Sequence, residues 1–203
     1  MKLLAICLGR PERLPGKSFK TGIYKSAVNA AVMIDGLGLV GDAVRNTKHH
    51  GGEDQAILLE GSLTLDWWAD ALGRDFPPGT FGENLIVEGL DNRDVAVGDR
   101  FHIGEVVLEA TCARSPCNTL AVKMGDPKFL KTYVRAARPG IYCRVVKSGM
   151  VSPGDPARHQ LYAGERVMIA EMLAAVGRNL SETQRARFLA APIGHRWRPT
   201  FET

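Results

Sequence analysis

The segment ARSPCNTL surrounds Cys117 with polar side chains, whereas cysteine is more often a buried apolar residue. Arg114 can lower the pKa of the thiol electrostatically, and Pro116 stiffens the loop. Ser115 and Asn118 can donate hydrogen bonds to a bound oxyanion. Because a thiolate is both a nucleophile and a metal ligand, the segment predicts a reactive or ligating Cys117 rather than a structural one.

A second polar segment, NTKHHGGEDQAI, contains two histidines, two glycines and two acids. His49 or His50 can donate or accept a proton near neutral pH. Glu53 or Asp54 can orient the ring. Gly51 and Gly52 let a ligand approach the backbone closely. The alternative is a polar turn that leads into a strand and leaves both histidines solvated.

Three residues elsewhere are weaker candidates. Asn84 stands at the entry to FGENLIVEGL, where its amide can bond the polar edge of a ligand. Lys25 and Arg45 can meet a phosphate as cations. Taken singly, each is more typical of a capping or solvated residue. No Walker, GxSxG or HExxH motif is present.

The bulk composition limits the classes of protein. The 203 residues correspond to one domain, or to one domain with an appendage. The net charge is only +4 and no basic run of five occurs, so we expect no nucleic-acid partner. No apolar run approaches the ~20 residues of a membrane span, and no secretory leader is recognisable. Scattered cysteines without CxxC spacing predict free thiols and a cytoplasmic protein.

Glycine-punctuated short strands dominate the first two-thirds of the chain. Such a pattern favours a closed or nearly closed β-barrel. The strand-like ranges are 1–9, 22–29, 56–60, 84–89, 95–111 and 141–149.

Helices interrupt these strands. The stretch SLTLDWWADALG predicts a helix with Ser62 as N-cap and with Leu63, Trp67 and Ala71 on the buried stripe. DPKFLKTYVRAARPG predicts a second helix that begins at Asp126. Its expected inward residues are Phe129, Leu130, Tyr133 and Val134.

The tail from about Gly164 has a different character. It predicts a strand followed by helices, one of which starts with a capping box between Ser181 and Gln184. Trp197 near the end is compatible with a surface that packs on a second subunit, as in a homodimer, or equally with a cap on the chain's own barrel.

The ordered segments together resemble a known family. GD followed by HHGGEDQAI, then FGENLIVEGL, VGDRFHIG, RSPC and GIYCRVVKSG resemble the MOSC domain, the C-terminal domain of molybdenum-cofactor sulfurases and its stand-alone relatives. The tail resembles the helical extension of the YiiM-type branch. The resemblance implies a mainly β fold with helices: a MOSC-type β-barrel domain over residues 1–163 and a strand-and-helix extension over 164–203.

The same resemblance implies a chemistry. The ligand would be the molybdenum cofactor, a pterin dithiolene with a phosphate, and Cys117 would bind molybdenum through sulfur. Such proteins reduce N-hydroxylated bases and related small molecules to amines, with electrons from a separate reductase. A thiolate is a soft ligand that suits this metal.

Site roles follow as hypotheses. We expect His50 or His49 to supply a proton, oriented by Asp54, beside Cys117. The residues expected to hold the cofactor are Lys25, Arg45, His49, Gly51, Gly52, Asn84, Arg114, Ser115 and Asn118.

Other functions fit the same residues. In a first alternative the protein is not catalytic, and Cys117 holds a persulfide or passes the cofactor on. A zinc site from His49, His50, Cys112 and Cys117 is disfavoured, because neighbouring histidines diverge on an extended backbone. A barrel that only binds another protein is the remaining alternative.

Overall fold

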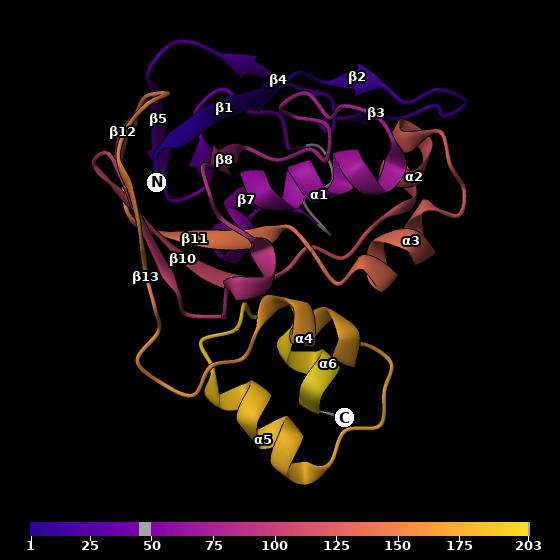
Figure 1. The fold of residues 1–203 in the computed structure, drawn as a ribbon, viewed down its shortest axis with the longest axis vertical. Coiled ribbons are helices and arrows are strands. Elements are labelled where there is room, and N and C mark those ends of the chain that lie inside the picture. Colours follow the sequence, from indigo (N-terminus) through magenta and orange to yellow (C-terminus); the bar gives the residue numbers. More distant parts are fainter. Residues whose placement is uncertain (45–49, 203) are drawn as a thin grey trace.

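The computed structural model describes residues 1–44 and 50–202. A curved sheet layer with three helices forms one part of the molecule, and three C-terminal helices pack below it (Figure 1). The strands are β1 (Leu3–Gly9), β2 (Glu12–Arg13), β3 (Lys20–Thr21), β4 (Lys25–Val28), β5 (Val32–Asp35), β6 (Gly38–Leu39), β7 (Ile57–Gly61), β8 (Leu85–Val87), β9 (Arg100–Ile103), β10 (Val106–Ala113), β11 (Ile141–Lys147), β12 (Gly149–Val151) and β13 (Ala157–Gln160). The helices are α1 (Ser62–Leu72), α2 (Asn118–Met124), α3 (Phe129–Ala136), α4 (Ile169–Ala175), α5 (Glu182–Ala190) and α6 (Arg198–Glu202), with 3₁₀ turns η1 (Glu53–Gln55) and η2 (Asn92–Asp94).

The main sheet has eight strands in the order β13-β9-β10-β11-β7-β8-β1-β4. All pairs are antiparallel except β7 with β8. The predicted mainly β fold with helices is confirmed. Closure into a barrel is not shown, because the pairings of the described strands leave the order open. An isolated bridge between Lys2 and Pro156 links the chain just before β1 to the chain just before β13.

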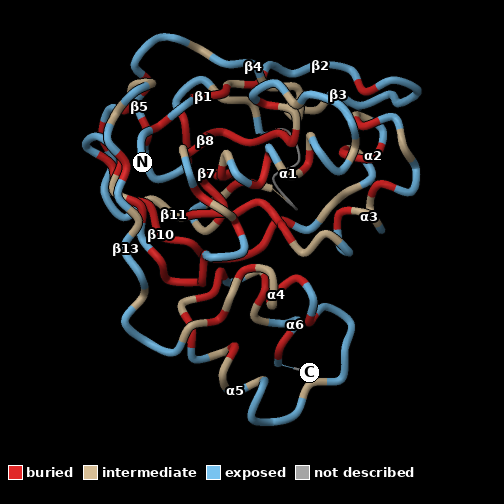
Figure 2. The backbone as a smooth tube through the Cα atoms, viewed as in Figure 1, coloured by how far each residue is buried: buried red, intermediate tan, exposed pale blue. Residues whose placement is uncertain are grey.

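The core explains why several strands lack an alternating pattern. All five residues of β7 are buried, since helices or loops cover both faces of this central strand. An aromatic cluster fills the space between the sheet and α1 and α3: the Trp68 ring lies 5.6 Å from Phe81, 5.5 Å from Phe129 and 5.8 Å from Tyr133. Figure 2 shows the buried sheet strands in red.

Helix α1 differs from its prediction. Ser62 is the first helical residue and not the N-cap, because its hydroxyl accepts a hydrogen bond from the backbone N–H of Gly89 at 2.9 Å. The buried stripe consists of Thr64, Leu65 and Trp68, whereas Leu63 is 48% exposed. The predicted stripe was therefore displaced by one position.

Helix α3 begins later than predicted, at Phe129. The Asp126 carboxylate accepts from the backbone N–H of Lys128 at 2.8 Å, so this segment forms a turn before the helix. Phe129 and Tyr133 are buried as predicted, but Val134 is 45% exposed.

The C-terminal extension contains helices α4, α5 and α6. The strand predicted from Gly164 is wrong, because only a single bridge between Ala96 and Met168 forms there. The capping box of Ser181 and Gln184 is confirmed. Trp197 is 8% exposed and packs within the chain. The domain boundary at 163/164 stays a prediction. No helix in residues 1–44 and 50–202 has the length and apolarity to span a bilayer.

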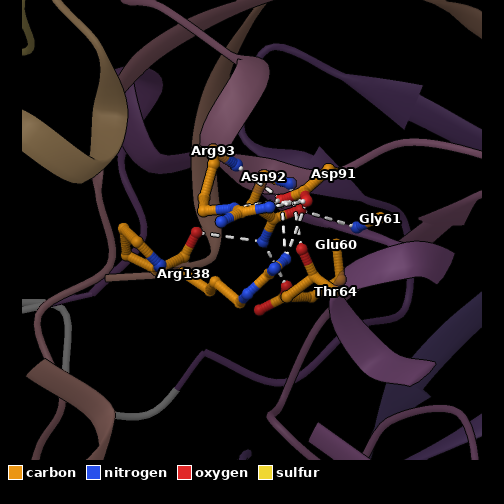
Figure 3. Close-up of polar contacts among 8 residues, drawn as sticks. Glu60, Gly61, Thr64, Asp91, Asn92, Arg93 and Arg138 are labelled. Carbon is orange, nitrogen blue, oxygen red and sulfur yellow. Dashed lines mark hydrogen bonds and ion pairs between the residues drawn. The ribbon is translucent and has the colours of Figure 1, made fainter. Parts of the chain in front are cut away.

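A buried polar cluster centred on Asn92 joins the end of β7, the start of α1 and the chain before β11 (Figure 3). The Asn92 amide accepts from the backbone N–H of Gly61 at 2.8 Å and donates to Glu60 and to the Pro139 carbonyl. Its own backbone N–H donates to the Thr64 hydroxyl at 2.9 Å. The cluster fixes the start of α1 and the chain before β11.

Burial changes the pKa of one member of this cluster, Glu60. Desolvation raises the pKa of Glu60 to about 8, and nearby Glu83 adds to the rise. The carboxyl is therefore largely protonated at neutral pH.

Candidate functional site

Cys117 lies in the loop between β10 and α2, immediately before the first helical residue of α2. It is the one cysteine of the four that is half-buried; the other three are buried. Two pockets adjoin its side chain, and both are also lined by His50, Gln55 and Tyr142. The thiol therefore lies where two cavities meet.

The surroundings of Cys117 favour the thiolate. Burial by itself raises the pKa, but a hydrogen bond from His50, the charge of Arg114 and the backbone N–H of Leu120 outweigh it and lower the pKa to about 6. The thiol is mostly ionised at neutral pH. The Tyr142 hydroxyl lies 3.2 Å from Nδ1 of His50, which leaves the other ring nitrogen for the thiolate.

The surroundings of the other three cysteines disfavour the thiolate. Desolvation raises the pKa of Cys112 to about 12 and of Cys7 to about 12, and it also raises the pKa of Cys143. No cluster of three His, Cys, Asp or Glu residues suitable for a metal occurs in residues 1–44 and 50–202. His49 of the zinc alternative lies outside the described residues.

The first pocket, of about 180 Å³, extends from Cys117 toward β4. Arg114 lines it and is only 3% exposed. Its Nε and Nη1 atoms are buried and have no hydrogen-bond partner among the described residues. Its guanidinium carbon lies 5.8 Å from the centre of the Tyr133 ring. A buried guanidinium with unpaired N–H groups is a strong site for an anionic ligand.

A network around Asp42 forms another part of the first pocket. Its carboxylate pairs with Lys25 and accepts from the Asn84 side chain at 2.8 Å and from the backbone N–H of Gly9 at 2.8 Å. The Asn84 oxygen also accepts from the backbone N–H of Leu58 at 3.1 Å. Lys25 and Asn84 thus line the pocket, and their predicted binding of the cofactor stays a prediction; the charge of Lys25 is already paired with Asp42.

The loop at residues 50–55 brings backbone groups to Cys117. Gly51 has φ 71°, and a Cβ there would lie 2.8 Å from the Val44 side chain, so glycine is required on both grounds. Gly52 also has a positive φ, 83°, as N-cap of η1. The Gly51 carbonyl accepts from Nη1 of Arg196 at 2.9 Å.

Asp54 does not have its predicted partner. Its carboxylate accepts from the backbone N–H and Nδ1 of His195 at 2.8 and 2.7 Å, and Arg144 pairs with the other oxygen at 2.9 Å. The expected orientation of His50 by Asp54 is therefore wrong; Tyr142 contacts that ring instead.

The second pocket, of about 520 Å³, lies between the sheet part and the C-terminal extension. Val176, Arg196, Trp197 and Thr200 contribute the wall from the extension. Ser115 lines this pocket, whereas Asn118 is exposed and lines neither. Arg45 and His49, which were predicted to bind the cofactor, lie outside the described residues.

Several pocket residues were not predicted. Among them are Asp42, Gln55, Thr119, Tyr142 and the residues of the extension. The Gly-Asp pair that contains Asp42 was a recognisable signal, but by itself it indicates only a turn. The others carry no local signal because distant segments meet here.

The fold and the sequence are similar to those of known proteins. A model of the MOSC domain matches residues 46–158. YflK of Bacillus subtilis is 32% identical, over 98% of this chain and 92% of its own length. A Gibberella moniliformis protein named "Reductase" is 29% identical over 75% of this chain, a region that spans 28% of that reductase. The crystal structure of YiiM from Geobacillus stearothermophilus has a TM-score of 0.82 and 26% identity, covering 99% of this chain and 97% of YiiM.

Proposed function

The chain belongs to the MOSC domain family, and on this premise we propose that it is a molybdenum-cofactor-dependent reductase of N-hydroxylated bases and related compounds. The observation that carries the proposal is Cys117, with its pKa lowered to about 6, in the pocket that the buried Arg114 also lines. Nε and Nη1 of Arg114 have no hydrogen-bond partner in the described part of the chain. A thiolate is a suitable ligand for molybdenum, and the guanidinium suits an anionic group of the cofactor.

The residues present fit that cofactor. Cys117 would hold the metal, and the N–H groups on Nε and Nη1 of Arg114 would bind anionic oxygens in the first pocket. The backbone of Gly51 would hold a polar edge of the pterin, and Asn84, whose amide is engaged by Leu58 and Asp42, would support the pocket wall. When bound, the cofactor supplies a molybdenum centre capable of two-electron oxygen-atom chemistry.

The chain's own residues would manage the protons. The overall reaction is R–NHOH + 2 e⁻ + 2 H⁺ → R–NH₂ + H₂O, in which the N–O bond breaks and the oxygen leaves as water. His50 is near Cys117 and can hold a proton there, and the Tyr142 hydroxyl fixes its ring. Burial raises the pKa of Tyr142 to about 12, so this hydroxyl stays neutral.

The second pocket would admit the substrate. It also reaches Cys117 and has the apolar surfaces of Val176 and Trp197 beside polar Ser115 and Thr200. Such a mixed wall suits a flat heterocycle with polar edges. The relative named "Reductase" supports a redox role, and the electrons would come from a separate reductase.

Molybdenum content tests the proposal. Wild-type protein from a host that makes the cofactor should contain about one molybdenum per chain and should reduce 6-hydroxylaminopurine with reduced methyl viologen. Cys117→Ser should lose the metal, whereas Cys112→Ala, which changes a buried thiol, should keep it. Well-folded wild type without molybdenum or pterin would contradict the proposal.

A second function shares the same thiol. An accessible Cys117 thiolate at the meeting point of two pockets also suits a persulfide or cofactor carrier. Bound cofactor without turnover of any N-hydroxylated purine, together with a persulfide on Cys117 by mass spectrometry, would favour this function.

A further inference from the structure

A short hairpin projects from the sheet part of the molecule beside the first pocket. Strands β2 and β3 form it, with Glu12 paired to Thr21 and Arg13 to Lys20 (Figure 1). We refer to residues 10–21 as the basic hairpin. Leu14 is 2% exposed and anchors it to the body, while most of its other residues are exposed (Figure 2).

The basic hairpin concentrates positive charge. It carries four cations and the single acid Glu12, a formal charge of +3, while the whole chain has only +4. The cations are Arg10, Arg13, Lys17 and Lys20, and all four are exposed. None of them forms an ion pair with any residue in the ranges 1–44 and 50–202. Their charge is therefore available to a partner.

The hairpin also borders the redox site. Phe19, Lys20 and Thr21 line the first pocket, which continues to Cys117. Phe19 is 49% exposed, so an aromatic ring stands at the rim among the cations. A protein bound to the hairpin would cover the mouth of this pocket, a position suited to electron delivery.

We propose that the basic hairpin is the docking surface for an acidic electron-donor protein, a small flavin or iron–sulfur carrier. The inference rests on the proposed reductase function, because that reaction consumes two electrons and the chain has no recognisable iron–sulfur motif. Its GxGxxG stretch at residues 36–41 starts in the turn between strands β5 and β6 and does not join a strand to a helix, as a flavin-binding fold requires. The donor is oxidised in two one-electron steps, and the protons come from the site and solvent. Charge complementarity of this kind raises the association rate and weakens with salt.

Charge reversal away from the pocket lining tests the inference. The variant Arg13→Glu/Lys17→Glu alters the hairpin without touching a pocket residue. Arg158→Glu/Arg178→Glu has the same change in net charge on exposed residues of β13 and the C-terminal extension. Cofactor-loaded full-length proteins would reduce 6-hydroxylaminopurine with either reduced flavodoxin, an acidic donor, or reduced methyl viologen, which needs no docking surface.

We expect the hairpin variant to raise the flavodoxin concentration at half-maximal rate by about tenfold or more at low salt. The control variant should stay within about twofold of wild type, and the viologen-driven rate should be unchanged in both. Carbodiimide cross-linking should join Lys17 or Lys20 to flavodoxin carboxylates, and this readout does not depend on turnover.

Two results would overturn the inference and leave the proposed function standing. In the first, the hairpin and control variants depend equally on flavodoxin concentration. In the second, the hairpin variant loses binding to duplex DNA while its kinetics with flavodoxin are unchanged. Absence of viologen-driven turnover in loaded wild type would instead refute the reductase function, and the docking inference with it.

Discussion

The carboxylate of Asp54 accepts hydrogen bonds from both the backbone N–H and the ring Nδ1 of His195, although 141 residues separate the two. The next residue, Arg196, donates to the Gly51 carbonyl at 2.9 Å and to the Gln55 side chain at 3.0 Å. The C-terminal extension is thus fastened directly to the loop that carries His50. This contact explains how a separate helical layer can shape the site.

Asp54→Asn should weaken this attachment. The substitution removes the charge that pairs with Arg144 and His195, so we expect a loss of about 1–3 kcal/mol in the free energy of unfolding at pH 7. Its partners lower the pKa of Asp54 against the opposing effect of burial. The stabilisation is therefore present above the ordinary pKa of 3.8 and is lost as the pH falls through the lower folded value.

Urea unfolding of both proteins between pH 3 and 7 measures this effect. The stability difference between wild type and Asp54→Asn should shrink toward the acid end. A difference that stays constant over the whole range would mean that the Asp54 charge contributes nothing.

The Cys117 thiol should react fast at neutral pH. With a pKa of about 6, its alkylation by iodoacetamide in cofactor-free protein should rise with pH and level off above about pH 7. His50→Ala should raise this pKa, because the ring donates a hydrogen bond to the thiolate. A rise by one to two pH units lowers the thiolate fraction at pH 7 by about two- to tenfold.

Asp54→Asn separates the direct His50 hydrogen bond from the attachment of its loop to the extension, because Asp54 contacts His195 and not His50. Its alkylation profile should overlay that of wild type. A shift as large as that of His50→Ala would restore the orienting role that the sequence predicted for Asp54.

Arg114 should be needed for cofactor retention. Arg114→Leu removes the buried N–H groups that face the first pocket, and we expect at least tenfold less bound pterin in purified protein. Arg114→Lys keeps a positive charge but lacks the planar set of guanidinium donors, so its pterin content should lie between those of wild type and Arg114→Leu. Equal pterin content in all three proteins, measured by fluorescence after oxidation, would exclude this anchor.

Asn92 should be important for stability without contacting either pocket. Asn92→Ala leaves the buried Gly61 N–H, Pro139 carbonyl and Glu60 carboxyl without a partner, and the expected loss is about 2–4 kcal/mol in urea. Asn179→Ala, at an exposed position, should change stability by less than about 0.5 kcal/mol. Similar midpoints for the two variants would show that the cluster in Figure 3 contributes little.

Local sequence patterns were sufficient for many elements. Short apolar runs bounded by glycine correctly predicted β7, β8, β10 and β11, because propensity and turn chemistry act over a few residues. The capping box of Ser181 with Gln184 is a similarly local interaction. The stripe of α1 was missed because Ser62 bonds Gly89, a residue outside the helix. Closure into a barrel would need pairing between the edge strands β4 and β13, which no local pattern describes.

For the site, the sequence by itself determined which side chains could do chemistry: Cys117 with Arg114 in one segment, and His50 with Gly51 in another. Only the tertiary structure decided their partners. It placed Tyr142 beside His50, His195 beside Asp54 and Asp42 beside Lys25. It also buried Nε and Nη1 of Arg114 with no acceptor among residues 1–44 and 50–202. The reason is physical: pKa values and hydrogen bonds depend on burial and on distances between segments far apart in the chain, which spacing along the sequence does not contain.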